Sequence, residues 1–130
     1  METKTLNEFI QYLPVPALIA KYCPDDSINH PILFVNRRFQ QEIGYEQTEI
    51  PDKETWWQLA YPDIAYRKVV KNQWELEEEL AGRERRNFTK LDVLITNKMG
   101  EEKRYRVLCS PCPGLPEYIQ VLFINIEQTV

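Results

Sequence analysis

The stretch from residue 118 to residue 126 constrains the fold of this chain more than any other, because it is apolar on both faces of a strand. Its two alternating sets are Ile119, Val121 and Phe123, and Leu122, Ile124 and Ile126. A strand on the surface of a sheet keeps one polar face, whereas a strand with two apolar faces is covered on both sides. The pattern predicts a central strand, between residues 17–22 and residues 103–110.

The remaining elements follow from hydrophobic periodicity and from breaker residues. Apolar residues at helical spacing predict helices over residues 3–13, from Asn36 to Ile43, from Glu54 to Tyr61 and from Asp63 to Gly82. Period-two alternation predicts strands over residues 17–22, 32–35, 88–96, 103–110 and 118–126, with a Pro- and Gly-rich turn over residues 111–116. This order predicts a single α+β domain.

Four residues predict where helices begin and end. Asn36 and Asp63 have side chains that accept hydrogen bonds from the free N–H groups of a first helical turn. Gly44 suits the left-handed position after a helix, and Gly82 is expected to end the long helix. Trp74 lies on the apolar stripe of that helix, and we expect it to be largely buried against the sheet.

Composition and charge exclude several classes of protein. The 130 residues are 43% hydrophobic, and no apolar run approaches the roughly 20 residues that cross a membrane. Sixteen basic and 20 acidic residues give a net charge of −4, which argues against a nucleic acid bound through its phosphates. Three cysteines, and a start without a signal peptide, favour a reducing cytoplasmic setting. No phosphate loop, dinucleotide fingerprint, zinc-protease or serine-hydrolase motif is present, so we expect no catalytic residues and no metal site.

Five segments, in this order along the chain, resemble the PAS (Per-Arnt-Sim) sensory domain. They are Phe34 to Phe39 with Ile43-Gly44-Tyr45, then Trp56 through Tyr61-Pro62-Asp63, then Tyr66-Arg67 with Trp74, then Lys98-Met99-Gly100 with Arg104, and Phe123 to Glu127. The resemblance covers residues 14–128, which would form one domain behind an N-terminal helix over residues 1–13.

The resemblance implies a five-stranded antiparallel sheet with helices packed on one face and a pocket between them. The candidate pocket residues are Phe34, Phe39, Ile43, Trp57, Tyr66, Val70, Trp74, Val93, Val107 and Phe123. Large aromatics either line such a pocket for a small ligand or fill it. The implied function is signal sensing or protein interaction, as the input module of a protein whose attached output is a histidine kinase or a cyclic-dinucleotide enzyme.

Two cysteines give the first alternative. Cys109 and Cys112 form a CxxC motif, which serves in redox couples and in zinc sites. A redox pair works best at a helix N-terminus, and this pair leads from a strand into a turn. A zinc site needs two more ligands, and only Cys23 and His30 remain.

The sequence names no cofactor and argues against two. His30, the only histidine, precedes Pro31 in an early turn, where we expect a surface residue, whereas haem-binding members of the family carry theirs near the long helix. Covalent flavin chemistry in the light-sensing branch uses a cysteine within Asn-Cys-Arg-Phe. No cysteine of this chain lies in that context, although Asn36 to Phe39 has a superficial likeness.

The apolar stripe of the N-terminal helix predicts that this helix packs against another apolar surface. Its apolar stripe consists of Leu6, Phe9, Ile10 and Leu13. A helix this short is only marginally stable alone in water, so it must pack against another surface. It either folds back on its own sheet or packs against the same helix of a second copy, and the resemblance favours the homodimer. A purely structural dimerisation domain with a filled core is the other alternative.

Overall fold

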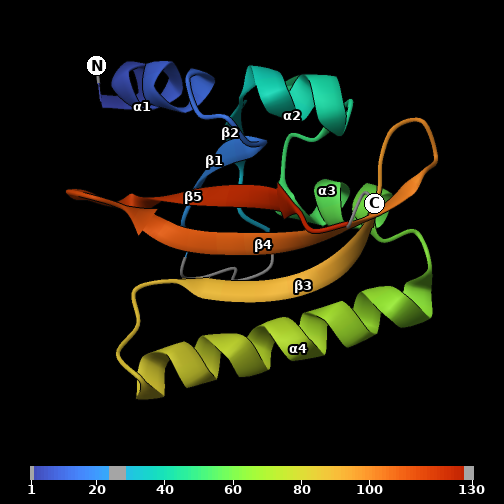
Figure 1. Cartoon of the computed structure of the whole chain (residues 1–130). Coiled ribbons are helices and arrows are strands. Elements are labelled where there is room, and N and C mark those ends of the chain that lie inside the picture. The colour runs from blue at the N-terminus through green and yellow to red at the C-terminus, as the bar shows by residue number, and fades with distance from the viewer. Residues whose placement is uncertain (1, 24–28, 128–130) are drawn as a thin grey trace.

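The fold is known from a computed structural model, which describes residues 2–23 and 29–127. Its elements, in chain order (Figure 1), are α1 (Glu2–Gln11), β1 (Ala17–Lys21), β2 (Ile32–Val35), α2 (Arg37–Glu42), the 3-10 helix η1 (Gln47–Glu49), α3 (Lys53–Ala60), α4 (Ile64–Arg83), β3 (Thr89–Thr96), β4 (Glu102–Cys112) and β5 (Leu115–Asn125). The α+β class and the predicted order of helices and strands are confirmed. Only η1 had no counterpart among the predicted elements.

The five strands form one antiparallel sheet in the order β2-β1-β5-β4-β3. The strand that is apolar on both faces is therefore central, as predicted. Leu18 of β1 lies opposite Val121, and Val107 of β4 lies opposite Phe123. The first and last strands of the chain thus meet at the middle of the sheet.

Each face of the sheet carries its own apolar cluster. Successive residues of a strand point to opposite faces, so Leu18 and Ala20 join the main core with α2, α3 and α4, whereas Ala17 and Ile19 face the other way. Ile10 of α1 completes this second cluster. The central strand is apolar on both faces because each face has a cover.

The helix α1 lies on its own sheet, which is one of the two arrangements predicted for it. Ile10 is fully buried there, and Leu6 and Leu13 pack around it. Phe9 points away and is 59% exposed. The apolar stripe is therefore divided, and most of it is not free for a second copy.

Asn36 joins three elements from a fully buried position. Its side-chain oxygen accepts from the backbone N–H of Phe39, which caps α2 as predicted, and from the N–H of Ala17, both at 2.9 Å. Its amide nitrogen donates to the carbonyl oxygens of Ile10, at 2.9 Å, and Val15, at 2.8 Å. One side chain thus fixes α1, β1 and α2 to one another.

The turn predicted over residues 111–116 is shorter in the structure. β4 runs on to Cys112, which pairs with Leu115, and only Pro113 and Gly114 remain in the turn. Gly114 has φ +76°, a conformation that glycine adopts without a steric penalty. A Pro-Gly pair makes the reversal in two residues, so the neighbouring residues stay in the strands.

The helix α4 runs along β3 at the margin of the sheet (Figure 1), so its apolar stripe is only partly covered. Val70 and Ala81 are buried, whereas Val69 is 47% exposed and Leu80 is 42% exposed. The prediction that Trp74 is largely buried is wrong in degree, because Trp74 packs half-buried at the rim of the main core.

Three helix ends were predicted, with different success. Asp63 caps α4 by accepting from the N–H of Tyr66, and Gly44 follows α2 at φ +101°, as predicted. Gly82, however, does not end α4, which continues to Arg83. The residue with positive φ beyond this helix is Arg85, at φ +58°.

Both margins of the sheet have some of their outward backbone groups engaged. At β3, the hydroxyl oxygen of Tyr66 accepts from the N–H of Leu94 at 2.9 Å. At β2, the N–H of Ile32 donates to the carbonyl of Pro51 at 2.9 Å, and its carbonyl accepts from the Gln47 amide at 2.7 Å.

Candidate functional site

A buried cavity of about 60 Å³ lies between the sheet and the helices α3 and α4. Six of the ten candidate pocket residues line it, namely Trp57, Val70, Trp74, Val93, Val107 and Phe123. They come from two helices and three strands, so the fold brings together side chains that are up to 66 residues apart (123 − 57).

The other four candidates lie outside the cavity. Phe39 and Ile43 are buried in the main core, where the Phe39 ring packs on Phe123 at 5.5 Å between centroids. Tyr66 lies at the margin beside β3. Phe34 faces α1 instead, because it lies opposite Ile19, a residue of the second cluster. A bulge in the pairing of β1 with β2 sets which β2 side chains reach each face, and alternation alone does not reveal it.

The cavity is also lined by three polar side chains that the sequence did not predict there, namely His30, Lys53 and Cys109. His30 is buried, so the expectation of a surface residue is wrong. Its carbonyl accepts from the N–H of Lys53 at 2.8 Å, and Pro31 forms a bridge with Asp52. These backbone contacts draw the residue before Pro31 against α3, and no sequence pattern signals them.

Lys53, the first residue of α3, places its ammonium group 5.1 Å from the centroid of the Trp57 ring. A cation over the face of an indole is attracted by the ring's quadrupole. Burial lowers the pKa of Lys53, and the nearby Cys109 and Glu78 act against that shift. Lys53 is thus a partly desolvated cation in a mostly apolar wall.

The two cysteines of the CxxC motif lie on opposite faces of the sheet. Cys109 lines the cavity, whereas Cys112 packs with Ile10 in the cluster under α1. Burial raises the pKa of Cys109 to about 12 and also raises the pKa of Cys112. Neither thiol is activated, and the pair does not share a site. Within residues 2–23 and 29–127, no group of three or more His, Cys, Asp or Glu side chains could hold a metal ion.

From the cavity, aromatic contacts lead to the end of β5. Phe123 lines the cavity, and its ring lies 6.5 Å from that of Tyr105, edge to face. The hydroxyl of Tyr105 donates to a carboxylate oxygen of Glu42 at 2.8 Å. Burial raises the pKa of Tyr105, and the hydrogen bond to Glu42 raises it further. Tyr105 therefore stays a neutral donor that ties β4 to α2.

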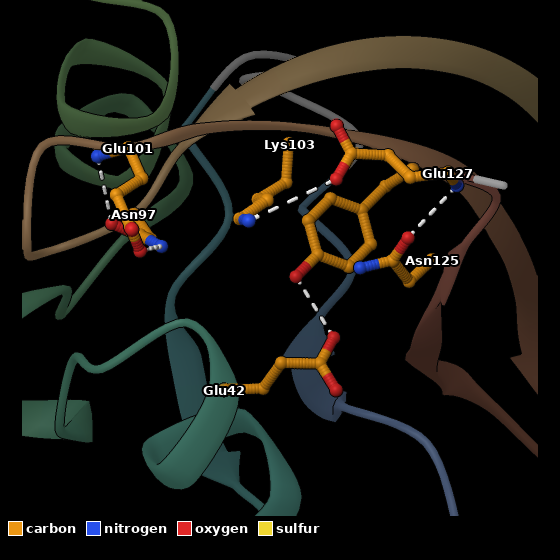
Figure 2. Close-up of polar contacts among 7 residues, drawn as sticks. Glu42, Asn97, Glu101, Lys103, Asn125 and Glu127 are labelled. Carbon is orange, nitrogen blue, oxygen red and sulfur yellow. Dashed lines mark hydrogen bonds and ion pairs between the residues drawn. The ribbon is translucent and has the colours of Figure 1, made fainter. Parts of the chain in front are cut away.

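The last described residues of the chain gather around this tyrosine. Figure 2 shows Asn125 and Glu127 at the end of β5, Lys103 of β4 beside Glu127, and Glu42 reaching from α2 toward the tyrosine hydroxyl. The Glu127 carboxylate lies 3.9 Å from the Lys103 ammonium, and the Asn125 side chain accepts from the Glu127 N–H at 2.9 Å. We call Glu42, Lys103, Tyr105, Asn125 and Glu127 the exit cluster.

Comparison with known proteins gives matches at the level of structure. No family model matches the sequence, and no curated protein matches it. The Rhodobacter sphaeroides LOV protein superposes with a TM-score of 0.66 at 11% identity, over 99% of this chain and 69% of that one. A domain of a sensory box sensor histidine kinase/response regulator from Geobacter sulfurreducens superposes at 0.58 and 13% identity, over 95% and 94%. The LOV domain of the Erythrobacter litoralis EL346 blue-light activated histidine kinase gives 0.53 and 20%, over 89% and 99%.

This chain has the fold of LOV and PAS sensory domains. The family resemblance inferred from five short segments is thereby confirmed for the fold, and so is the five-stranded antiparallel sheet with its helices. At 11% to 20% identity, the comparison with these three structures extends to the fold alone. No helix of the described residues is both long and apolar enough to cross a membrane.

The residues of this cavity do not fit a flavin or a haem. Sites for cofactors and drug-sized ligands occupy roughly 300–1,000 Å³, and this cavity has about 60 Å³. Trp57, Trp74 and Phe123 take up the space between sheet and helices. Of the described cysteines, Cys109 alone lines the cavity, from β4, and none lies on α3 or α4, the helices that border it.

Proposed function

We propose that this domain is a sensory input module of a larger signal-transduction protein and that it catalyses no reaction itself. One observation carries the proposal, namely that the wall of the buried cavity is also the start of the contacts that end in the exit cluster. Phe123 belongs to the cavity and touches Tyr105, and Tyr105 touches Glu42. A change in packing at the cavity can therefore reach the end of β5 through side chains that contact one another.

The mechanism is a shift between two arrangements of the helices over the sheet. A ligand or partner that binds one arrangement more tightly increases its population, by no more than its difference in affinity. The attached output domain would sense the arrangement at Glu127. The ion pair of Glu127 with Lys103 is exposed and weak, so it can form or break as the helices move. The output, a histidine kinase or a cyclic-dinucleotide enzyme attached to this domain in the cytoplasm, belongs to the same proposal.

Amide NMR spectra of the full chain test this coupling. Trp57→Ala removes one wall of the cavity, and benzene is the probe that enters the space. We expect benzene to shift the amide signals of Ile126 and Glu127, while the signal of Glu8, on the opposite side of the sheet, stays in place. Shifts that stop at the cavity wall would overturn the proposal.

A second variant tests the route itself. Tyr105→Phe, introduced beside Trp57→Ala, keeps the aromatic contact with Phe123 but removes the hydrogen bond to Glu42. The benzene-induced shift at Glu127 should then fall, while the shifts at the cavity wall remain. Equal shifts at Glu127 with and without the hydroxyl would show that the signal does not pass through Tyr105.

We also propose a homodimer that uses the outward side of α1. Phe9 on α1 is 59% exposed, and Tyr12, the residue after the helix, is 89% exposed. Phe9→Glu should shift a dimer toward monomer in sedimentation, whereas Gln40→Glu adds the same charge to an exposed position on α2 and should not. Deleting residues 1–13 is a poor test, because it would uncover the cluster that Ile10 closes. A wild-type chain that is monomeric at tens of micromolar contradicts the dimer and would leave the sensory proposal standing.

A further inference from the structure

We infer that the groove between α3 and α4 binds a small aromatic carboxylic acid, with the ammonium group of Lys53 as the anchor for its carboxylate. The inference rests on the sensory function proposed above and gives that function a class of ligand.

The groove is large enough for a small ligand and adjoins the buried cavity. Its volume is about 410 Å³, within the range of small-molecule sites. Lys53, Trp57 and Trp74 line both the groove and the cavity. These three side chains therefore form the partition between an open cleft and the centre of the main core.

Lys53 makes no direct ion pair. Within residues 2–23 and 29–127, no ion pair and no side-chain hydrogen bond involves its ammonium group, which lies over the ring of Trp57, and Glu78 interacts with it only electrostatically, without a direct contact. Moving a cation out of water is costly unless an anion or several acceptors replace the water. A carboxylate in the groove would provide that replacement, with a charge-assisted hydrogen bond to the ammonium group.

The rim of the groove selects a single negative charge. Arg67, Lys68 and Lys71 of α4 line it together with Lys53. Glu54, Glu75 and Glu78 line it as well, so four basic side chains face three acidic ones, a balance that favours one negative charge over a dianion such as phosphate. Burial raises the pKa of Glu78, which makes that side chain less unfavourable to an anion than an ordinary glutamate. A ligand with a single negative charge, held by Lys53, fits this balance of basic and acidic side chains.

The walls of the groove favour a ligand that carries an aromatic ring. Trp57 and Trp74 are both only partly buried, so they present ring surface to the cleft as well as to the core. Aromatic rings pack on one another in offset or edge-to-face contacts that add to the free energy of burial. A ring seated against these two indoles would press on the same partition that borders Phe123, and the ligand would thereby act on the route to the exit cluster.

Matched acids and amides test the anchor on the full chain. The probes are benzoate with benzamide, phenylacetate with phenylacetamide, and indole-3-acetate with indole-3-acetamide, titrated at pH 7. Each pair keeps the ring and exchanges only the charge. Binding is followed by the indole N–H signals of Trp57 and Trp74 in NMR spectra, which also locate the ligand. We expect at least one acid to bind about tenfold more tightly than its amide, the usual effect of a charged partner in a hydrogen bond.

Variants at two lysines assign that preference. Lys53→Met should remove the preference for the acid, and Lys53→Arg, which keeps the positive charge, should retain most of it. Lys90→Met, which removes an exposed charge on β3 outside the groove, is the matched control and should leave the preference within about twofold. Lys53→Gln, a polar and neutral change, replaces the methionine variant if thermal melting shows that the latter does not fold.

Two results would overturn the inference. One is that no acid in the three pairs binds more tightly than its amide, and the other is that the preference persists without the Lys53 charge. Neither result depends on the benzene-induced shifts at Glu127, so the anchor and the sensory function can fail separately. An acid that binds at Lys53 without moving the exit cluster would support the site and contradict its role in sensing.

Discussion

Replacing Asn36 by alanine should be among the most destabilising single changes in this domain. The side chain is fully buried and makes four hydrogen bonds to backbone groups, three of them to residues 19 to 26 positions away along the chain. The variant leaves two N–H groups, of Ala17 and Phe39, and two carbonyl groups without their partner. Alanine also leaves a small void that the buried backbone around it cannot easily fill.

The expected loss of stability is about 3–5 kcal/mol. Loss of a helix N-cap costs about 0.5–2 kcal/mol, and each buried group left unpaired costs about 1–3 kcal/mol. The full sum would exceed 5 kcal/mol, but the carbonyl of Val15 is only partly buried, so water can reach it. Because domains of this size are stable by roughly 5–15 kcal/mol, the variant should be only marginally folded.

Urea denaturation followed by tryptophan fluorescence measures this loss directly. Asn72→Ala is the matched control, because Asn72 is exposed in the middle of α4 and alanine favours a helix there. We expect the control to change the free energy of unfolding by less than about 0.5 kcal/mol. A loss below about 1 kcal/mol for Asn36→Ala would refute the reasoning, since the four bonds would then contribute almost nothing.

Two further substitutions and one measurement of thiol reactivity test other features of the fold. Gly44→Ala should cost about 1–3 kcal/mol in thermal melts, because φ is +101° and the new Cβ would lie 2.9 Å from the Cβ of Lys98; an unchanged melting temperature would contradict this. Tyr105→Phe should lower the free energy of unfolding by about 1–2 kcal/mol through the lost bond to Glu42, and urea curves that superpose on wild type would count against that bond. Cys109 should react with iodoacetamide at pH 8 about a thousandfold more slowly than an ordinary thiol, because a pKa of about 12 leaves that much less thiolate; rapid alkylation located by mass spectrometry would show that the pKa of this thiol is not raised.

Sequence patterns predicted the elements whose position depends on local chemistry. The two-sided apolar run of β5 fixed its place at the centre of the sheet, because only a central strand is covered on both faces. Asn36, Asp63 and Gly44 marked helix ends, because a cap or a positive φ is satisfied by few residue types. In each case the requirement is met within a few residues of the chain.

Features that depend on distant contacts were not predicted. The stripe on α1 suits its own sheet or a second copy equally well, and periodicity cannot tell which surface will cover it. The burial of His30 depends on backbone bonds between the stretch before β2 and the start of α3. Lys53 was overlooked because a lysine at a helix start normally lies in solvent, and nothing local shows that Trp57 and the sheet will enclose it.

The engaged margins of the sheet limit how this domain can meet another chain. A bare strand edge is a template to which a strand from another molecule can add. Here Tyr66 occupies the N–H of Leu94 on one margin, and Ile32 gives both of its backbone groups to the segment around Pro51 on the other. Strand addition at these positions would first have to displace contacts within the domain. At these positions, copies placed in tandem along a longer chain would therefore meet through helices and faces rather than by pairing their strands.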